Sequence, residues 1–185
     1  MSFFKAYDMR GTFGRDFNLD TVYRIGRWMP SVLRAQKFLI GRDIRLSSQA
    51  IRNALCDGLN DAGADADDMG LSTTPMVYFF TARKKYDASV QITASHNPAG
   101  DNGMKVSSRG AIPVGGDTGL KDIEARILSG KLLERAPRRG VTRCVDFFDE
   151  YVQWMKSLGL NFNGVNFAVD CSNGASCKLT KSLLN

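Results

Sequence analysis

Apolar side chains along this 185-residue chain follow helical and strand-like spacings in turn. In the first helical pattern, over residues 19–35, they recur every three or four positions, which is typical of an amphipathic helix. These apolar positions are Val22, Ile25, Met29, Val32 and Leu33. Asn18 or Asp20 is the expected cap of this helix, and Pro30 should kink or end it.

The next two helices have recognisable starts. Ser47 or Ser48 is expected to cap the second helix, and Gly63 should close it. Residues 73–75, Thr-Thr-Pro, open the third helix, because proline is well suited to a first helical turn.

Short apolar or alternating segments between the helices predict strands. The expected strands cover residues 38–41, 69–71, 89–93, 104–107 and 165–170. Residues 65–68, Asp-Ala-Asp-Asp, are interpreted as capping the turn after Gly63 and not as a metal-binding loop.

Two further helices complete the pattern. One is capped by Asp117 or Thr118 and ends at Gly130, with apolar positions at Leu120, Ile123, Ile127 and Leu128. An aromatic-rich amphipathic helix covers residues 145–158. Because strands and helices alternate along the chain, the sequence predicts an α/β fold.

A polar and basic stretch at residues 132–142, with Pro137 and Gly140, is a candidate linker. It divides the chain into a first domain at residues 1–140 and a second part at residues 141–185. The second part is expected to hold a connecting helix and the start of another α/β domain, which its length does not complete.

The amino-acid composition limits the kinds of molecule that the protein is expected to bind. Hydrophobic residues make up 43% of the chain, so a folded domain is expected. No apolar run approaches the ~20 residues that cross a bilayer, and the N-terminus does not resemble a signal peptide, so no membrane partner and a cytoplasmic location are expected. The net charge of +6 comes from scattered basic residues without a nucleic-acid-binding motif. An anionic small substrate or a plain solvated surface explains the charge, and no nucleic-acid partner is expected.

Four cysteines lie at positions without metal-binding spacing. They are Cys56, Cys144, Cys171 and Cys177. The sequence predicts free and mostly buried thiols.

The most informative stretch is residues 92–106, Ile-Thr-Ala-Ser-His-Asn-Pro-Ala-Gly-Asp-Asn-Gly-Met-Lys-Val. It contains the single histidine of the protein, His96, directly after Ser95, and Lys105 follows ten residues beyond that serine. A hydroxyl, an imidazole and an amine are therefore concentrated in and beside one loop rich in turn-forming residues. Loops of this kind, held between rigid elements, often bind ligands or catalyse reactions.

This stretch resembles the active-site serine loop of the α-D-phosphohexomutases, the phosphomannomutase/phosphoglucomutase family. Three other segments resemble that family in the same order and at about the same spacing. They are residues 4–11 (Phe-Lys-Ala-Tyr-Asp-Met-Arg-Gly), 41–48 (Gly-Arg-Asp-Ile-Arg-Leu-Ser-Ser) and 116–120 (Gly-Asp-Thr-Gly-Leu). The resemblance implies a three-layer α/β/α domain with a mixed, mostly parallel sheet, followed by the first strand and helix of a second α/β domain.

The resemblance also implies an isomerase that interconverts hexose 6-phosphate and hexose 1-phosphate, of mannose or glucose, through a hexose 1,6-bisphosphate. Ser95 is then the phosphoserine, since serine forms a stable phosphoester. Lys105 takes the proton of the sugar hydroxyl and later returns it. His96 is the third catalytic candidate, which orients a phosphate or shares the proton transfer.

Other residues are implied around this centre. Tyr7 contacts the substrate, and Arg10 steadies the phosphoserine charge because a guanidinium fork matches phosphate oxygens. The alternative for Arg10 is a simple ion pair with Asp8. A supporting role is implied for Arg42, Asp43, Arg45, Asn97 and Asn102.

The same resemblance implies Mg²⁺, with the phosphate on Ser95 as one ligand. The Asp-x-Asp-x-Asp loop that gives the family three carboxylate ligands does not occur in this sequence, nor do the family's sugar-specificity and phosphate-binding loops. The chain is therefore expected to need domains 2–4 as partners, to be inactive by itself, and to self-associate through any apolar face that those domains cover.

Two rival interpretations stay open. Residues 101–103, Asp-Asn-Gly, resemble the phosphoglucosamine mutase branch of the family. A non-catalytic remnant that binds a phosphosugar or a partner protein is the second.

Overall fold

A mixed seven-stranded sheet forms the centre of the protein in a computed structural model that describes residues 3–131, 133–159, 161 and 163–184. Its strands are β1 (Met9–Thr12), β2 (Lys37–Arg42), β3 (Asp65–Leu71), β4 (Ala88–Ile92), β5 (Asp101–Ser108), β6 (Ile112–Pro113) and β7 (Thr142–Cys144). The α-helices are α1 (Leu19–Leu33), α2 (Ser48–Asp61), α3 (Thr74–Arg83), α4 (Leu120–Leu128), α5 (Phe148–Ser157) and α6 (Ser176–Leu184). None of these helices is both long enough and apolar enough to span a membrane.

The strand order is β1-β5-β4-β2-β3-β7, with β6 paired to β5. Strands β4, β2, β3 and β7 pair in parallel, whereas β5 is antiparallel to each of its neighbours β1, β4 and β6. Strand β5 is therefore the one strand that runs against the others. The expected mixed, mostly parallel sheet is confirmed.

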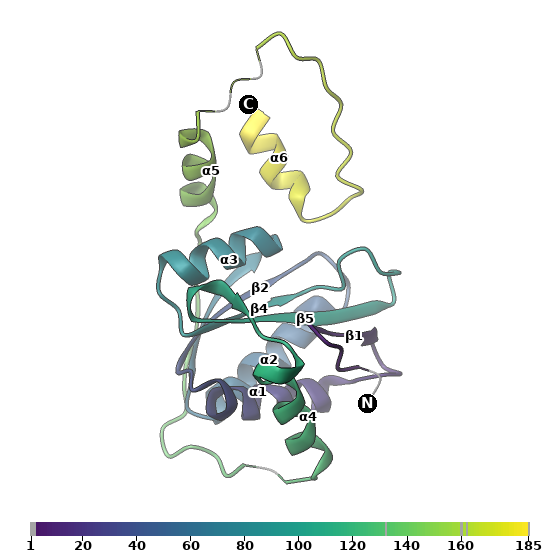
Figure 1. The fold of residues 1–185 in the computed structure, drawn as a ribbon, viewed down its shortest axis with the longest axis vertical. Coiled ribbons are helices and arrows are strands. Elements are labelled where there is room, and N and C mark those ends of the chain that lie inside the picture. The colour runs from purple at the N-terminus through teal and green to yellow at the C-terminus, as the bar shows by residue number, and fades with distance from the viewer. Residues whose placement is uncertain (1–2, 132, 160, 162, 185) are drawn as a thin grey trace.

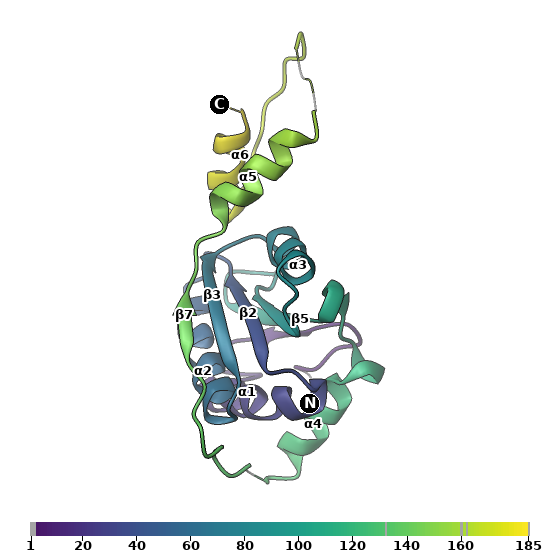
Figure 2. The same cartoon turned by 90° about the vertical axis from the view of Figure 1, so that its left-hand side faces the viewer.

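Helices cover both faces of the sheet, as Figures 1 and 2 show. Phe38 and Ile40 of β2 pack in a core with α1, α2 and α4, while Leu39 packs in a second core with α3 and α5. This division follows from the alternation of side chains along a strand, and it accounts for a central strand that is apolar on both faces from Phe38 to Ile40. The three-layer α/β/α arrangement follows directly.

Helix α1 starts and ends largely as its sequence predicts. The side chain of Asn18 accepts a hydrogen bond from the amide of Thr21 at 2.9 Å, so Asn18 and not Asp20 is the cap. Pro30 lies in the last turn, and the helix ends after Leu33, where Arg34 has a left-handed backbone with φ of 52°. Helix α4, by contrast, begins after Gly119, so the cap predicted at Asp117 or Thr118 is wrong by one or two residues.

The interpretation of residues 65–68 as capping a turn is wrong, because they form the first half of β3. Their carboxylates are tolerated inside the fold because each has a partner from a distant segment. The hydroxyl of Tyr86 donates to Asp67 at 2.7 Å, and Arg52 pairs with Asp68 at 2.7 Å.

The C-terminal part differs from its sequence pattern in two places. Strand β7, which begins at the last residue of the predicted linker, adds to the edge of the sheet beside β3, and the sequence missed it, as it missed β1 and β6. Residues 165–170, all described, form no strand, and they run extended and exposed before α6 (Figure 1). Their alternating pattern has no neighbouring strand to pair with here. The domain division at residue 140 stays a prediction.

The four cysteines are free, but the prediction that most are buried is wrong. Cys56 is buried, and burial raises the pKa of its thiol to about 11. Cys144 and Cys177 are exposed, and Cys171 is half-buried. Two thiols of the C-terminal part are therefore accessible to solvent chemistry.

Candidate functional site

The serine loop lies at the carboxyl end of β4, between Ile92 and the start of β5 at Asp101. The neighbouring parallel strand β2 ends at Arg42, and the segment after it runs beside the serine loop, where Asp43 donates its amide to the carbonyl of Ile92 at 2.9 Å. Ligands gather at the carboxyl ends of strands in open α/β sheets. The topology therefore brings two of the sequence segments singled out above to the same edge.

Ser95 has a backbone conformation that is unusual for a serine. Its φ is +55°, in the left-handed region that mainly glycine and asparagine adopt. The hydroxyl of Thr93 accepts the amide of Ser95 at 2.9 Å and helps to hold this conformation. Strained residues persist where the surrounding structure determines them, and they cluster at functional sites. The side chain of Ser95 is exposed at the surface, next to His96, whose Nδ1 lies 3.4 Å from Ser95 Oγ.

Arg45 holds the serine loop through its main chain. The guanidinium donates to four carbonyl oxygens, two through Nη1 and two through Nη2. The acceptors are Pro98 at 2.6 Å, Asp101 at 2.9 Å, Ser95 at 3.0 Å and Asn97 at 2.7 Å. One side chain thus satisfies four backbone acceptors of the turn at once, which a planar five-donor group can do and a lysine cannot.

Asp43 and Asn102 support this arrangement from behind. Asp43 pairs with Arg45 Nε at 3.3 Å and accepts the hydroxyl of Ser48 at 2.6 Å. Asn102 is fully buried and donates to the hydroxyls of Ser47 and Ser48 at 2.8 and 2.9 Å. These bonds fix the start of α2 against the first residues of β5.

A second set of polar contacts joins the serine loop to β1. Arg10 donates to Asn97 Oδ1 at 2.8 Å, and Asn97 donates in turn to Asp101 at 2.8 Å. The hydroxyl of Thr12 donates to the other oxygen of Asp101 at 2.8 Å. The hydrogen bonds from Asn97 and Thr12 hold the pKa of Asp101 below its usual value.

The carboxylate of Asp8 contacts two cationic side chains, those of Arg10 and Lys105. Its Oδ2 accepts Arg10 Nη2 at 2.6 Å and Lys105 Nζ at 3.4 Å. The ion pair of Asp8 and Arg10, offered above as the alternative for Arg10, is therefore present, and Arg10 also reaches the serine loop. Lys105 points to the face of the sheet opposite its buried neighbours Met104 and Val106.

Other predicted residues lie outside these contacts in the described part of the chain. Tyr7 is 83% exposed, and Arg42 donates to the carbonyl of Asp43 at 3.3 Å. The structure thus brings together most of the predicted set through hydrogen bonds, with Asp8 linking Lys105 to Arg10 and Ser48 linking Asn102 to Asp43. The joined residues are Arg10, Asp43, Arg45, Ser95, His96, Asn97, Asn102 and Lys105, in two groups that meet at Asn97.

An open pocket of about 530 Å³ lies over Ser95 and His96. Besides these two, its walls are the segment after β2, including Ile44 and Leu46, and the turn at residues 172–174. Sequence analysis did not include that turn in the site, because 77 or more residues separate it from Ser95 and only the tertiary fold joins them.

The described residues do not fit a protein-held Mg²⁺. Among them, no group of three or more His, Cys, Asp or Glu side chains lies close enough together to hold a metal ion. Magnesium takes about six oxygen ligands in near-octahedral geometry, more than a single phosphoserine supplies.

The fold and the loop together define an α/β/α domain that presents a strained, exposed serine beside a histidine, on a loop held by an arginine. Residues 1–134 match the family model described as phosphoglucomutase/phosphomannomutase, alpha/beta/alpha domain I. The chain therefore belongs to the phosphoglucomutase/phosphomannomutase family.

Individual relatives agree with this result. The chain is 41% identical to an Escherichia coli phosphomannomutase over 177 residues, which are 94% of the chain and 39% of that protein. It is 44% identical to a Klebsiella pneumoniae phosphomannomutase over 150 residues, which are 80% of the chain and 96% of that protein. The chain thus spans about two fifths of the length of the Escherichia coli relative.

A solved structure shows the same fold. The crystal structure of a phosphoglucomutase/phosphomannomutase family protein from Burkholderia thailandensis superimposes with a TM-score of 0.83 at 32% identity. The match covers 98% of this chain and 41% of that protein.

Proposed function

We propose that this chain provides the phosphoserine loop of a phosphohexomutase that interconverts the 6-phosphate and 1-phosphate of mannose or glucose. The single observation that carries the proposal is the conformation of Ser95. It is an exposed serine with a φ of +55°, on a loop in which four main-chain carbonyl oxygens accept hydrogen bonds from Arg45. Held in this way, the hydroxyl is presented to the pocket at a fixed position, which is what a nucleophile in group transfer needs.

In the proposed cycle, the bond between Ser95 Oγ and phosphorus breaks as the phosphoryl group passes to a sugar hydroxyl. The amine of Lys105 accepts the hydroxyl proton. After the bisphosphorylated sugar has turned over, its other phosphoryl group passes to Ser95 Oγ and Lys105 returns the proton to the sugar oxygen. Bonds and protons balance over the two half-reactions.

The cations near the loop suit the charge that develops. Arg10 lies within hydrogen-bond distance of Asn97, two residues from Ser95, and His96 lies beside Ser95 Oγ. Both can donate to oxygens of a phosphate on Ser95, which stabilises the transferring group. Tyr7 is 83% exposed and is proposed to contact the sugar phosphate.

Mg²⁺ in this proposal supplies charge neutralisation at the phosphate. Because the described residues contribute no carboxylate cluster, its protein ligands are proposed to come from another domain of the same protein. The 185-residue chain by itself is then inactive as a mutase.

Mannose or glucose phosphate is favoured over glucosamine phosphate as the substrate. The side chain of Asp101 accepts hydrogen bonds from Thr12 on β1 and from Asn97 in the serine loop, and this structural role explains the aspartate without reference to the sugar. The relatives from Escherichia coli and Klebsiella pneumoniae both bear the name phosphomannomutase.

The test is peptide mapping of the protein expressed in its full reading frame and isolated without phosphatase. The expected result is a phosphate on Ser95 that disappears when mannose 6-phosphate or glucose 6-phosphate is added with Mg²⁺. The Ser95→Ala variant should lack it, and Ser89→Ala, in the same tryptic peptide, should keep it. An unmodified Ser95 that no hexose 1,6-bisphosphate can phosphorylate would favour the non-catalytic remnant.

A further inference from the structure

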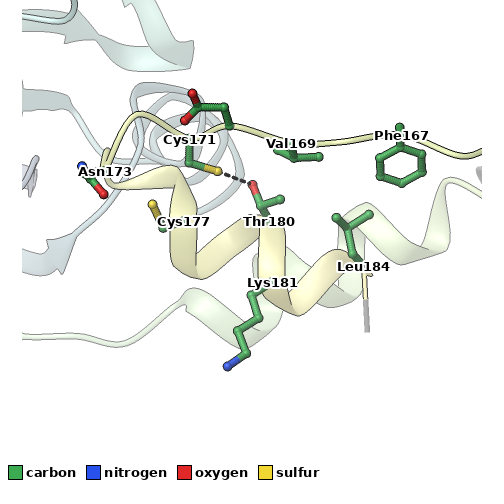
Figure 3. A pocket seen from close by; sticks show the side chains of 9 residues that line it. Phe167, Val169, Cys171, Asn173, Cys177, Thr180, Lys181 and Leu184 are labelled. Carbon is green, nitrogen blue, oxygen red and sulfur yellow. Dashed lines mark hydrogen bonds between the residues drawn. The ribbon is translucent and has the colours of Figure 1, made fainter.

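Two of the four cysteines lie together at the turn that borders the pocket. Cys171 ends the extended segment before the turn, and Cys177 is the second residue of α6. The chain folds back between them, because Gly174 donates its amide to the carbonyl of Cys171 at 2.7 Å and Cys177 donates to the carbonyl of Gly174 at 3.2 Å. Figure 3 shows the side chains of both cysteines among those that line one surface pocket.

The two thiols have different surroundings. A hydrogen bond joins Cys171 Sγ and Thr180 Oγ1 at 3.4 Å, drawn as a dashed line in Figure 3. This contact, with smaller contributions from Ser176 and Cys177, lowers the pKa of the Cys171 thiol. Desolvation by the surrounding atoms, followed by the neighbouring Cys171, raises the pKa of Cys177. Cys171 is therefore the better nucleophile of the pair, since the thiolate is the reactive form.

We propose that Cys171 and Cys177 form a disulfide within the chain when hydrogen peroxide or a related peroxide reaches the protein. The Cys171 thiolate attacks one peroxide oxygen, the O–O bond breaks, and Cys171 becomes a sulfenic acid while hydroxide leaves and takes up a proton. The Cys177 thiolate then attacks the sulfur of Cys171, and the sulfenic oxygen leaves as water. Two thiols are oxidised and one peroxide is reduced to two waters.

The disulfide would close a short loop around the turn at residues 172–174. This turn forms one wall of the pocket over Ser95 and His96. Oxidation would therefore tie α6 to that wall and restrict how the turn moves beside the serine. This consequence for catalysis rests on the function proposed above, whereas the formation of the disulfide does not.

The test uses the natural protease sites of the chain. Trypsin cleaves after Lys156 and after Lys178, so residues 157–178 form one peptide, which contains Cys171 and Cys177 and no other cysteine. The reduced protein is treated with equimolar hydrogen peroxide, alkylated and digested without reductant. The expected peptide has lost two hydrogens and has no alkyl group at either cysteine, and dithiothreitol restores both alkylation sites.

Single variants identify the order of events. Cys177→Ser should leave a sulfenic acid at Cys171 that dimedone traps, while Cys171→Ser should leave Cys177 open to alkylation. Cys144, an exposed thiol on β7, is the internal control and should oxidise several times more slowly than Cys171. Far-ultraviolet circular dichroism checks that both variants fold.

Three results would overturn the proposal. The first is full alkylation of Cys171 and Cys177 after peroxide treatment, the second is oxidation of Cys171 and Cys144 at equal rates, and the third is a disulfide from Cys171 or Cys177 to a second molecule. None of them bears on the phosphate of Ser95, so failure here and failure of the proposed function are distinguishable.

Discussion

Asp8 Oδ2 lies 3.4 Å from Lys105 Nζ, although 97 positions separate the two residues in the sequence. The same oxygen accepts Arg10 Nη2 at 2.6 Å. One carboxylate therefore fixes the amine proposed to move the proton and the guanidinium that reaches the serine loop. Neighbouring strands β1 and β5 make this possible, because the antiparallel pair places Arg10 opposite Gly103.

Replacement of Lys105 by methionine should reduce kcat of the complete enzyme about 10²- to 10⁴-fold, the usual contribution of a proton-transferring group. Methionine keeps most of the side-chain length but cannot accept a proton. Steady-state turnover of mannose 6-phosphate measures the effect. Lys156→Met, at an exposed position on α5, is the matched control and should be unchanged. Comparable loss in both variants would contradict a specific role for Lys105.

Asp8→Asn should reduce kcat less than Lys105→Met does, by roughly tenfold, because the carboxylate orients Lys105 and does not itself transfer the proton. The amide keeps the shape of the side chain and removes its charge. The positioning role predicts that kcat falls while KM for the sugar phosphate changes little, and that Asp8→Glu recovers part of the lost rate. If Asp8→Asn lowers only thermal stability and leaves kcat unchanged, Asp8 is structural.

Most of the first domain could be predicted from periodicity. The helical stripe of α1 and the alternation along β4 are local patterns, and local patterns are what a single sequence displays. Strand β3 was misread because Asp67 and Asp68 are polar, and their partners Tyr86 and Arg52 approach only after folding.

The serine loop could likewise be predicted, because its residues are contiguous in the sequence. The bond network of Asp8 could not, since its partner Lys105 lies on a distant strand. The turn at residues 172–174 was also missed as part of the pocket, because only the tertiary fold brings it beside Ser95. Residues 165–170 have a strand pattern, but a strand also needs a neighbour, which the pattern does not reveal.

Gly58→Ala should lower the free energy of unfolding by about 1–3 kcal/mol, the usual cost of overpacking. Helices α1 and α2 cross closely here, and a Cβ at Gly58 would overlap the carbonyl oxygen of Tyr23. The gain in helix propensity, up to ~1 kcal/mol, does not offset this contact. Urea denaturation measures the change. Asn53→Ala, exposed on the same helix, should be nearly neutral, and a neutral Gly58→Ala would mean that the two helices can separate without cost.

Asp101 should make the stability of the domain depend on pH. Hydrogen bonds from Asn97 and Thr12 lower its pKa in the folded protein. Because the pKa of this carboxyl group is lower in the folded than in the unfolded protein, ionised Asp101 stabilises the folded state. The stabilisation is complete above the pKa of the unfolded chain, about 4, and it is lost as the pH falls through the pKa of the folded protein. Asp101→Asn should therefore lower Tm near neutral pH, and the difference between the two proteins should shrink in acid. A difference that stays constant from pH 7 to pH 3 would contradict this account.

Arg45→Met should loosen the serine loop while the sheet stays intact. The guanidinium donates to four loop carbonyls and pairs with Asp43. A hydrogen bond that involves a charged group contributes about 1.5–3 kcal/mol to the stability of the folded protein. Because one group makes all four bonds, we expect a loss of about 2–3 kcal/mol in unfolding free energy. Hydrogen exchange should rise over residues 94–101 and stay unchanged in β2.

Arg45→Lys separates charge from geometry, because lysine keeps the charge but has no planar fork to reach four acceptors at once. It should restore the pairing with Asp43 and leave the loop exchanging faster than in the native protein. In the complete enzyme, the phosphate level on Ser95 should fall in the order native, lysine and methionine. Native-like exchange and phosphorylation in Arg45→Met would show that the conformation of Ser95 does not depend on Arg45.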